Sequence, residues 1–358
     1  MRFAFTDDQL TFRDVVRDLL AKECPPEVVR SSWPDGTDVH GARKGEGARA
    51  EPGTVERVWA ALADMGVLGV AVSEDRGGLG LSALDWVLLA EETGYAALPQ
   101  PFVDTVCVVA PLVDDAGDPD LVLADLVGGT RRAAALPLGS TLVPWGDTVT
   151  LLVALAHDVA TDRWTARRIE GGVARGAGTD TRRALAPVID AGRRTVQLEA
   201  WKGGDVIGTS AEVAAAFDRG ALGTAAQLVG LGRRMLDMTV DYVAERRQFG
   251  VPVGSQQAVK HHLADAAMAL RFAAPAVYAA AWSVATGDDH AVRAVSTAKA
   301  LASDAARLTA RHALQCHGAI GYTVEYDLHL YLKRAEVLAR TWGDAAWHRA
   351  RVAHSLGI

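Results

Sequence analysis

Hydrophobic residues in the first third of the chain recur with the period of an α-helix. Thr6 and Gln9 have the spacing of a capping box and precede an apolar stripe that ends before a pair of prolines. Ser82 and Asp85 show the same spacing ahead of a second apolar stripe. These signals predict an N-terminal helical domain over residues 1–125.

The middle of the chain has the pattern of strands. Short runs rich in β-branched and apolar residues lie at 149–155, 164–166 and 194–198, and Gly, Asp and Pro separate them. Runs of this length with such breakers are typical of short paired strands. They predict a small antiparallel β domain over residues 126–205.

The helical period returns after the strands. Apolar residues within 228–242 follow the three-and-four spacing of a bundle seam. A second helix contains Pro275, where we expect a kink, and the fourth covers 325–352. The pattern predicts a C-terminal four-helix bundle over residues 206–358, so the fold class is mainly α with a middle β domain.

Composition narrows the class of protein. The 358 residues are 49% hydrophobic and 23% charged, which is typical of a globular chain, and the net charge of −7 argues against nucleic-acid binding. Cys24, Cys107 and Cys316 are far apart and the histidines lack metal spacing, which predicts a reducing compartment and no metal site. The N-terminus lacks a signal-peptide pattern and no continuous apolar run reaches ~18 residues, so we expect a cytoplasmic protein without membrane contact.

The sequence ERRQFG at 245–250 forms a corner between two helical patterns, because the following VPVG cannot be helix interior. The start of the next helix directs free N–H groups and its positive dipole end outward, and an arginine adds bidentate recognition of phosphate. Such a corner suits an anion, although these six residues alone favour the simpler alternative. The alternative on the same residues is a solvated helix end with cations near the C-terminal dipole.

Two motifs resemble those of the acyl-CoA dehydrogenase family. RRQFGVPVGSQQAVKHHLADAAMAL resembles the family's flavin-contacting corner, and QCHGAIGY at 315–322 resembles its Q-x-x-G-G-x-G-[YF] turn, with Ala319 in place of a family Gly. A weaker match extends over nearly the whole chain. The resemblance implies the family's order of helical, β and bundle domains. It also implies FAD-dependent α,β-dehydrogenation of an acyl-CoA thioester, in which a Glu removes the α-proton.

Both positions at which the family carries that Glu hold other residues. Aligning Glu325 and Tyr326 with the family's E-Y pair puts Trp342 at the usual position, followed by the family's Gly at 343. The second position, counted back from the Phe-Gly pair along the first bundle helix, falls on Gly220. The resemblance therefore implies that this chain has no catalytic residue of its own.

The middle region also departs from the family. The T-E-P and G-S-D groups that hold the flavin ring are replaced by ALPLGS at 135–140, and the segment is shortened. In the family's oligomers the middle domain of one subunit holds the flavin, while the corner and the turn of a neighbour hold its pyrophosphate and adenosine. The resemblance assigns these neighbour-directed FAD contacts to Arg246, Gln248, Phe249, Gln257, Gln315, Gly318 and Gly321.

We therefore expect a non-catalytic subunit of a heteromeric acyl-CoA dehydrogenase that completes the FAD site of a catalytic partner subunit. In the family such heterotetramers act on steroid side-chain acyl-CoAs, so fatty acid or steroid side-chain catabolism is the expected role, with the acyl-CoA bound mainly by the partner. One alternative is a self-sufficient dehydrogenase with a relocated base. The other is a scaffold subunit without flavin contact. The carboxylates available as a relocated base are Glu199, Glu212, Glu325 and Glu336.

Overall fold

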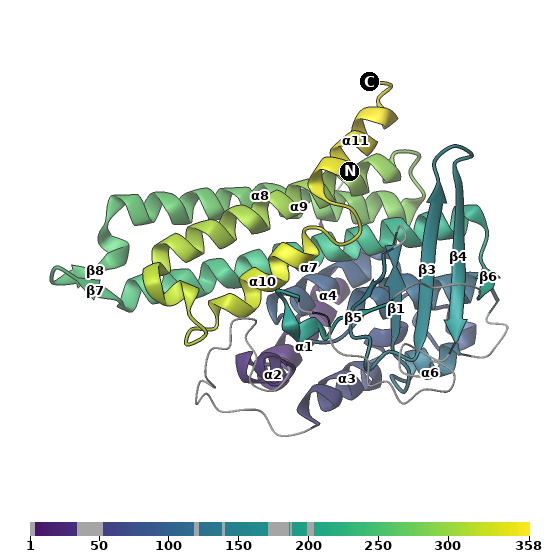
Figure 1. Cartoon of the computed structure of the whole chain (residues 1–358), viewed down its shortest axis with the longest axis horizontal. Coiled ribbons are helices and arrows are strands. Elements are labelled where there is room, and N and C mark those ends of the chain that lie inside the picture. Colours follow the sequence, from purple (N-terminus) through teal and green to yellow (C-terminus); the bar gives the residue numbers. More distant parts are fainter. Residues whose placement is uncertain are drawn as a thin grey trace.

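The computed structural model describes residues 4–33, 53–117, 122–137, 140–170, 186, 188–198 and 204–358, shown in Figure 1. Residues 32–53, whose Pro, Gly and charged residues without a period predict a long surface loop, lie almost entirely outside the described residues. Helices precede the first strand. They are α1 (Asp7–Glu23), α2 (Pro26–Ser31), α3 (Thr54–Asp64), α4 (Ala83–Tyr95), the π-helix η3 (Val103–Val109), α5 (Ala110–Asp115) and α6 (Leu123–Val127).

Both predicted capping boxes are confirmed. The Thr6 hydroxyl accepts from the Gln9 backbone N–H at 3.3 Å, while the Gln9 side chain accepts from the Thr6 N–H at 2.9 Å. Ser82 and Asp85 make the same reciprocal arrangement at the start of α4. These side chains satisfy N–H groups that have no partner inside the helix, and therefore α1 and α4 begin where the sequence predicts.

A small sheet follows the N-terminal helices. Its strands are ordered β1-β3-β4-β6, and a separate antiparallel pair joins β2 to β5. The expectation of a purely antiparallel unit is wrong, because β1 pairs with β3 in parallel. The chain passes through β2 between these two strands and re-enters the sheet from the same end. The bounds are β1 (Ala133–Leu136), β2 (Leu142–Val143), β3 (Leu151–Asp158), β4 (Arg163–Glu170), β5 (Val196–Gln197) and β6 (Asp205–Ile207).

The C-terminal part is a helical bundle, as predicted, but its fourth helix is split. A turn at 339–344 separates the last two helices, and Trp342 and Gly343 there have φ of +59° and +87°. Pro275 lies inside α8 and does not interrupt it. The elements are α7 (Ser210–Glu245), β7 (Arg247–Gln248), β8 (Val251–Pro252), α8 (Gln257–Thr286), α9 (Ala291–His317), the short helix η7 (Gly318–Tyr322), α10 (Leu328–Leu338) and α11 (Ala345–Ser355).

One core joins the N-terminal helices, the sheet and the bundle. Side chains alternate along β3, so Leu151, Val153 and Leu155 face this core while Leu152 and Ala154 enter a second, smaller one. Both faces of β3 are thus covered. The sheet is held firmly against α7, whose first residue, Ser210, accepts a hydrogen bond from the Trp164 N–H at 2.8 Å.

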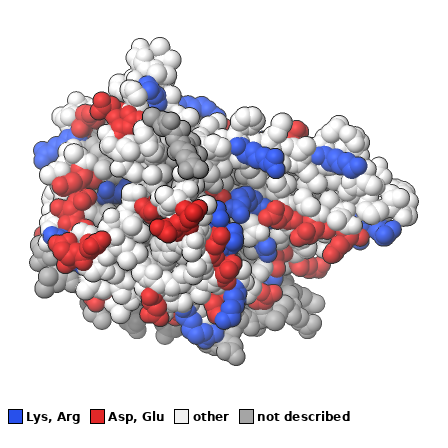
Figure 2. All heavy atoms as spheres, turned by 180° about the vertical axis from the view of Figure 1, so that it is seen from behind, with Lys and Arg blue, Asp and Glu red and all other residues white. Residues whose placement is uncertain are grey.

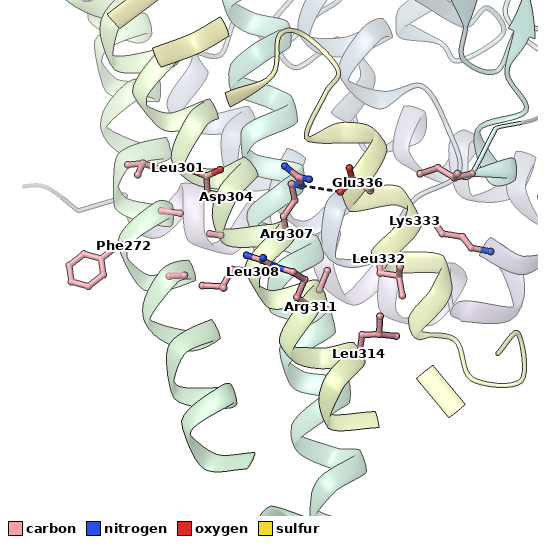
Figure 3. Close-up of a pocket in the computed structure, with 15 residues that line it drawn as sticks. Phe272, Leu301, Asp304, Arg307, Leu308, Arg311, Leu314, Leu332, Lys333 and Glu336 are labelled. Carbon is pink, nitrogen blue, oxygen red and sulfur yellow. Dashed lines mark hydrogen bonds and ion pairs between the residues drawn. The ribbon is translucent and has the colours of Figure 1, made fainter. Parts of the chain in front are cut away.

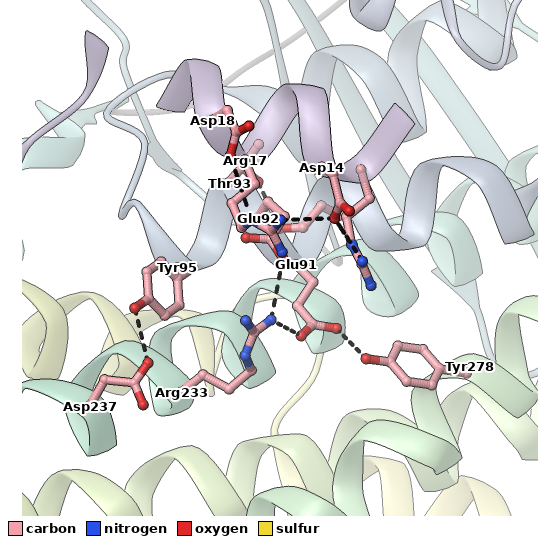
Figure 4. Close-up of polar contacts among 12 residues, drawn as sticks. Asp14, Arg17, Asp18, Glu91, Glu92, Thr93, Tyr95, Arg233, Asp237 and Tyr278 are labelled. Atoms are coloured by element: carbon pink, nitrogen blue, oxygen red, sulfur yellow. Dashed lines mark hydrogen bonds and ion pairs between the residues drawn. The ribbon is translucent and has the colours of Figure 1, made fainter. Parts of the chain in front are cut away.

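A buried polar cluster attaches α4 to the bundle (Figure 4). Arg233 of α7 pairs with both Glu91 and Glu92, and the Tyr278 hydroxyl of α8 donates to Glu91 at 2.6 Å. Burial raises the pKa of Glu92, while the Arg233 charge lowers it. One guanidinium thus contacts both carboxylates, and the cluster links α4, α7 and α8.

By its length and mean hydropathy, helix α8 could span a membrane. Helix α8 contains no continuous apolar run of ~18 residues, so the sequence did not predict such a span. It packs on α7 and α9 in the bundle (Figure 1) and leaves Phe272 76% exposed, so it is a bundle helix with an apolar outer face. On the face of the molecule shown in Figure 2, Lys and Arg are interspersed with Asp and Glu.

Candidate functional site

The predicted anion corner is an exposed hairpin at the end of α7. The backbone of Phe249 and Gly250 adopts φ of +52° and +82°, and β7 and β8 pair across this turn. The hairpin is tied to its flanks, since Val253 N–H donates to the Arg246 carbonyl at 2.7 Å. The Phe249 side chain is 97% exposed, which is unusual for an aromatic ring and leaves it free to pack against another molecule.

The corner has the donors that an anion requires. The Arg246 guanidinium is exposed and makes no hydrogen bond or ion pair with the described part of the chain. Helix α8 starts beside it at Gln257 with no side-chain cap and no acidic residue in its first turn. Free N–H groups next to an unpaired arginine are a site for phosphate oxygens, and this donor set fits the pyrophosphate of FAD.

The second motif lies beside the corner. The ring of His317 stacks on that of Tyr242, one turn before Arg246, with centroids 4.3 Å apart. Gly318 then turns the chain with φ +65° and ψ −139°, and a Cβ there would meet nothing within 4 Å. Gln315 is exposed and Gly321 is buried. The structure therefore brings both motifs to one end of the bundle, with open backbone at Gly318.

This end of the bundle is far from the sheet (Figure 1). Helix α7 begins at the sheet and ends at the corner, and its 36 residues span about 54 Å. Gly220 lies in the sheet-proximal part of the helix. The corner and the middle strands of one chain therefore do not share one binding site.

The two positions aligned with the family's base lie in direct contact. Trp342 is buried, and its ring atoms Cδ2 and Cε2 lie 2.6 Å from where a Cβ on Gly220 would be. The Phe217 ring packs against the indole edge-on, with centroids 5.7 Å apart. Neither residue offers a group that can accept a proton.

A cavity of about 560 Å³ lies between the sheet and the 339–343 turn. Asp104, Arg193, Thr341 and Trp342 contribute to its wall. Burial raises the pKa of Asp104 to about 6, although the Arg193 charge and the Trp342 indole N–H favour its ionised form. Sequence reasoning missed this carboxyl because Asp104 is surrounded by apolar residues in an ordinary helical pattern. Asp104 lies in a π-helix, and the sequence contains no signal that predicts this irregular turn.

Two of the four carboxylates considered as relocated bases, Glu212 and Glu336, have other partners. Glu212 accepts from the Thr209 N–H and caps α7. Glu336 pairs with Arg307 and Arg340, and Glu325 is exposed. Glu199 lies outside the described residues.

A second, larger cavity of about 700 Å³ lies among α8, α9 and α10 (Figure 3). Leu308, Leu314 and Leu332 line it, and the Arg307–Glu336 ion pair lies within its wall. It shares Ile189 and Glu336 with the first cavity but is lined by neither of the base positions. Within the described ranges, no group of three His, Cys, Asp or Glu residues could hold a metal ion.

Comparison with known proteins identifies the family. Residues 6–121 match the description "Acyl-CoA dehydrogenase, N-terminal domain", and residues 210–357 match "Acyl-CoA dehydrogenase, C-terminal domain". The chain is 30% identical to the acyl-CoA dehydrogenase IpdE2 of Mycobacterium tuberculosis over 332 residues, which cover 92% of this chain and 91% of the relative.

Solved structures share the fold. The crystal structure of the ChsE4-ChsE5 complex from Mycobacterium tuberculosis superposes with a TM-score of 0.82 at 22% identity and covers 100% of this chain and 99% of that one. The Tcur3481-Tcur3483 steroid ACAD variant gives a TM-score of 0.79 at 22% identity, with 98% of each chain covered. The chain belongs to the acyl-CoA dehydrogenase family of flavoproteins, oxidoreductases that act on CH–CH bonds.

Proposed function

We propose that this chain is the non-catalytic subunit of a heteromeric acyl-CoA dehydrogenase and that it completes the FAD site of a catalytic partner. The observation that carries the proposal is the separation of the corner from the chain's own sheet. Gly220 and Arg246 are 26 residues apart on α7 and its C-cap, or about 39 Å along the helix axis. An FAD held at the corner therefore has its flavin ring against another chain.

The corner and the turn supply the contacts. Arg246 pairs with the pyrophosphate, Gln248 and Gln257 hydrogen-bond to it or to the adenosine, and Phe249 packs beside the adenine. Gln315, Gly318 and Gly321 approach the cofactor through the turn, where the open backbone at Gly318 leaves room. When bound, FAD accepts the hydride of the dehydrogenation.

The proton acceptor comes from the partner. A thioester α-proton is removed by a carboxylate held at the α-carbon, and this chain has Trp342 and Gly220 at the two family positions. The acyl-CoA is accordingly bound and oxidised mainly in the partner. Support for a heteromer comes from the ChsE4-ChsE5 and Tcur3481-Tcur3483 complexes, and the latter, a steroid ACAD, favours steroid or fatty acid catabolism as the setting.

The test is the FAD content of the complex. We expect the purified chain to be colourless, and its complex with the catalytic partner to be yellow and active. Arg246→Ala should remove most of the FAD absorbance of that complex, because it deletes a charge-assisted contact to the pyrophosphate. Arg163→Ala changes an exposed arginine of β4 instead and is the matched control. Unchanged FAD content in Arg246→Ala would favour a scaffold subunit.

A second function rests on Asp104. Its buried carboxyl lies beside Trp342 in the 560 Å³ cavity and has its pKa raised to about 6, which suits a general base near neutral pH. In that case the chain is a self-sufficient dehydrogenase. It would then be yellow alone, would bleach on addition of an acyl-CoA, and would lose that bleaching in Asp104→Asn. A wild-type chain that never bleaches alone rejects this function.

A further inference from the structure

Gly220 and Trp342 form a complementary pair. A Cβ at position 220 would lie 2.6–2.7 Å from three atoms of the indole, a separation that real Cβ atoms essentially never show. Any side chain at 220 therefore needs the volume that the indole fills. Gly220 has no side chain, and the Trp342 ring occupies the space that a side chain there would fill. The residues at the two base positions therefore depend on each other.

Aromatic side chains from three elements surround the Trp342 indole. Phe217 of α7 packs edge-on against it and also contacts Trp164 of β4 and Trp347 of α11, with ring centroids 5.1 and 5.2 Å from its own. The indole N–H donates to the buried Asp104 carboxylate. This aromatic cluster closes the junction of sheet, α7 and C-terminal segment, and it leaves Trp342 only 1% exposed.

Side chains from α9 and α11 hold the turn that carries the indole. The Lys299 ammonium donates to the carbonyls of Ala339 and Gly343 at 3.1 and 3.0 Å, and His348 Nε2 donates to the Trp342 carbonyl at 2.8 Å. Trp342 itself has φ +59°, which is strained for a residue with a bulky side chain. A strained backbone conformation persists only where surrounding contacts hold it in place. These three hydrogen bonds hold the turn around Trp342.

We infer that Trp342 is a plug that closes this chain's own acyl-binding space, with Lys299 and His348 as its positioning residues. The inference rests on the proposed function, since the two base positions identify the space. The chain thus not only lacks a base but also excludes acyl-CoA thioesters from this space. A thioester bound where no carboxylate can remove its α-proton would be a dead-end complex, and the plug prevents it.

The experiment measures octanoyl-CoA binding to the full-length chain by isothermal titration calorimetry. We expect no binding to the wild type, and a dissociation constant at least tenfold lower than the wild-type limit for Trp342→Gly and Trp342→Leu. Trp347→Leu is the matched control, because it removes a neighbouring indole that supplies none of the three atoms nearest to a Cβ at position 220, and it should gain no binding. Equal binding by wild type and folded Trp342 variants overturns the plug.

A second measurement does not depend on the ligand. Gly220→Ala should lower the melting temperature of the chain, and combining it with Trp342→Gly should remove that effect, because the methyl group then enters vacated space. Additive shifts in the double variant would contradict the packing argument. Both measurements leave Arg246 untouched, so failure of the plug is distinguishable from failure of FAD completion, which the Arg246→Ala complex reports.

Discussion

His348 shows how burial changes the chemistry of a single residue. Its ring is fully buried, Nε2 donates to the Trp342 carbonyl, and Nδ1 has no partner in the described ranges. Burial lowers the pKa of His348, and the charges of Lys299 and Arg351 act in the same direction. The hydrogen bond to Trp342 and the Asp344 charge oppose them, and the net result is a pKa of about 3. The imidazole is therefore neutral in the folded protein at neutral pH.

Because His348 is neutral when folded, the free energy of unfolding depends on pH. The unfolded chain binds a proton at His348 below pH 6.5 and the folded chain only near pH 3, so stability is lost as pH falls between these values. At pH 4.5 the loss from this residue is about 2–3 kcal/mol. His348→Gln keeps a donor for the Trp342 carbonyl but cannot ionise. Urea unfolding at pH 7 and 4.5 should show a smaller loss for the variant, and equal losses would contradict the assignment.

At the scale of elements, α8 tolerates a residue that usually ends a helix. Pro275 sits mid-helix on an exposed face, where its ring displaces one backbone hydrogen bond. The helix continues because α7 and α9 pack along its other side, and tertiary packing outweighs local propensity.

Replacing this proline should stabilise the helix. Pro275→Ala restores an N–H donor toward the carbonyl four residues earlier, and the larger unfolded-state entropy of alanine offsets part of the gain. We expect a net stabilisation of about 1–2 kcal/mol. Thermal unfolding of the chain followed by far-UV circular dichroism measures it. A melting temperature that stays the same or falls would show that the ring is needed for packing.

At the scale of the whole molecule, Arg334 joins all three parts of the chain. From α10 it pairs with buried Asp190, which precedes β5, and donates to the carbonyls of Leu98 at 3.1 Å and Ala97 at 3.4 Å. Bundle, middle segment and N-terminal helices thus meet at one guanidinium. A planar group with five donors suits such a junction, where several acceptors must be satisfied without water.

Removing this arginine should destabilise the fold as a unit. Arg334→Leu leaves the Asp190 carboxylate and two carbonyls buried without their donor, which costs about 3–5 kcal/mol. Arg340→Leu is the matched control, because Arg340 pairs with Glu336 while 71% exposed, and solvent screens such exposed pairs so that they contribute little to stability. Urea unfolding of both variants measures the difference. A similar effect of the two would show that Arg334 is not the junction.

The sequence by itself determined the elements and the family. Capping boxes at Thr6 and Ser82, the strand runs and the bundle period are local signals, so the residues that form each element are neighbours in the chain. The two motifs also identified the acyl-CoA dehydrogenase family, because a turn that needs glycine and a corner that needs arginine tolerate few other residues.

Only the tertiary structure decided the relations between distant residues. The parallel pairing of β1 with β3, the burial of Asp104 beside Trp342 and the contact of that indole with Gly220 all join segments far apart in sequence. So does the separation of Arg246 from the sheet, which the length and direction of α7 establish. Periodicity reports which face of an element is apolar. Which other element covers that face depends on packing the whole chain at once.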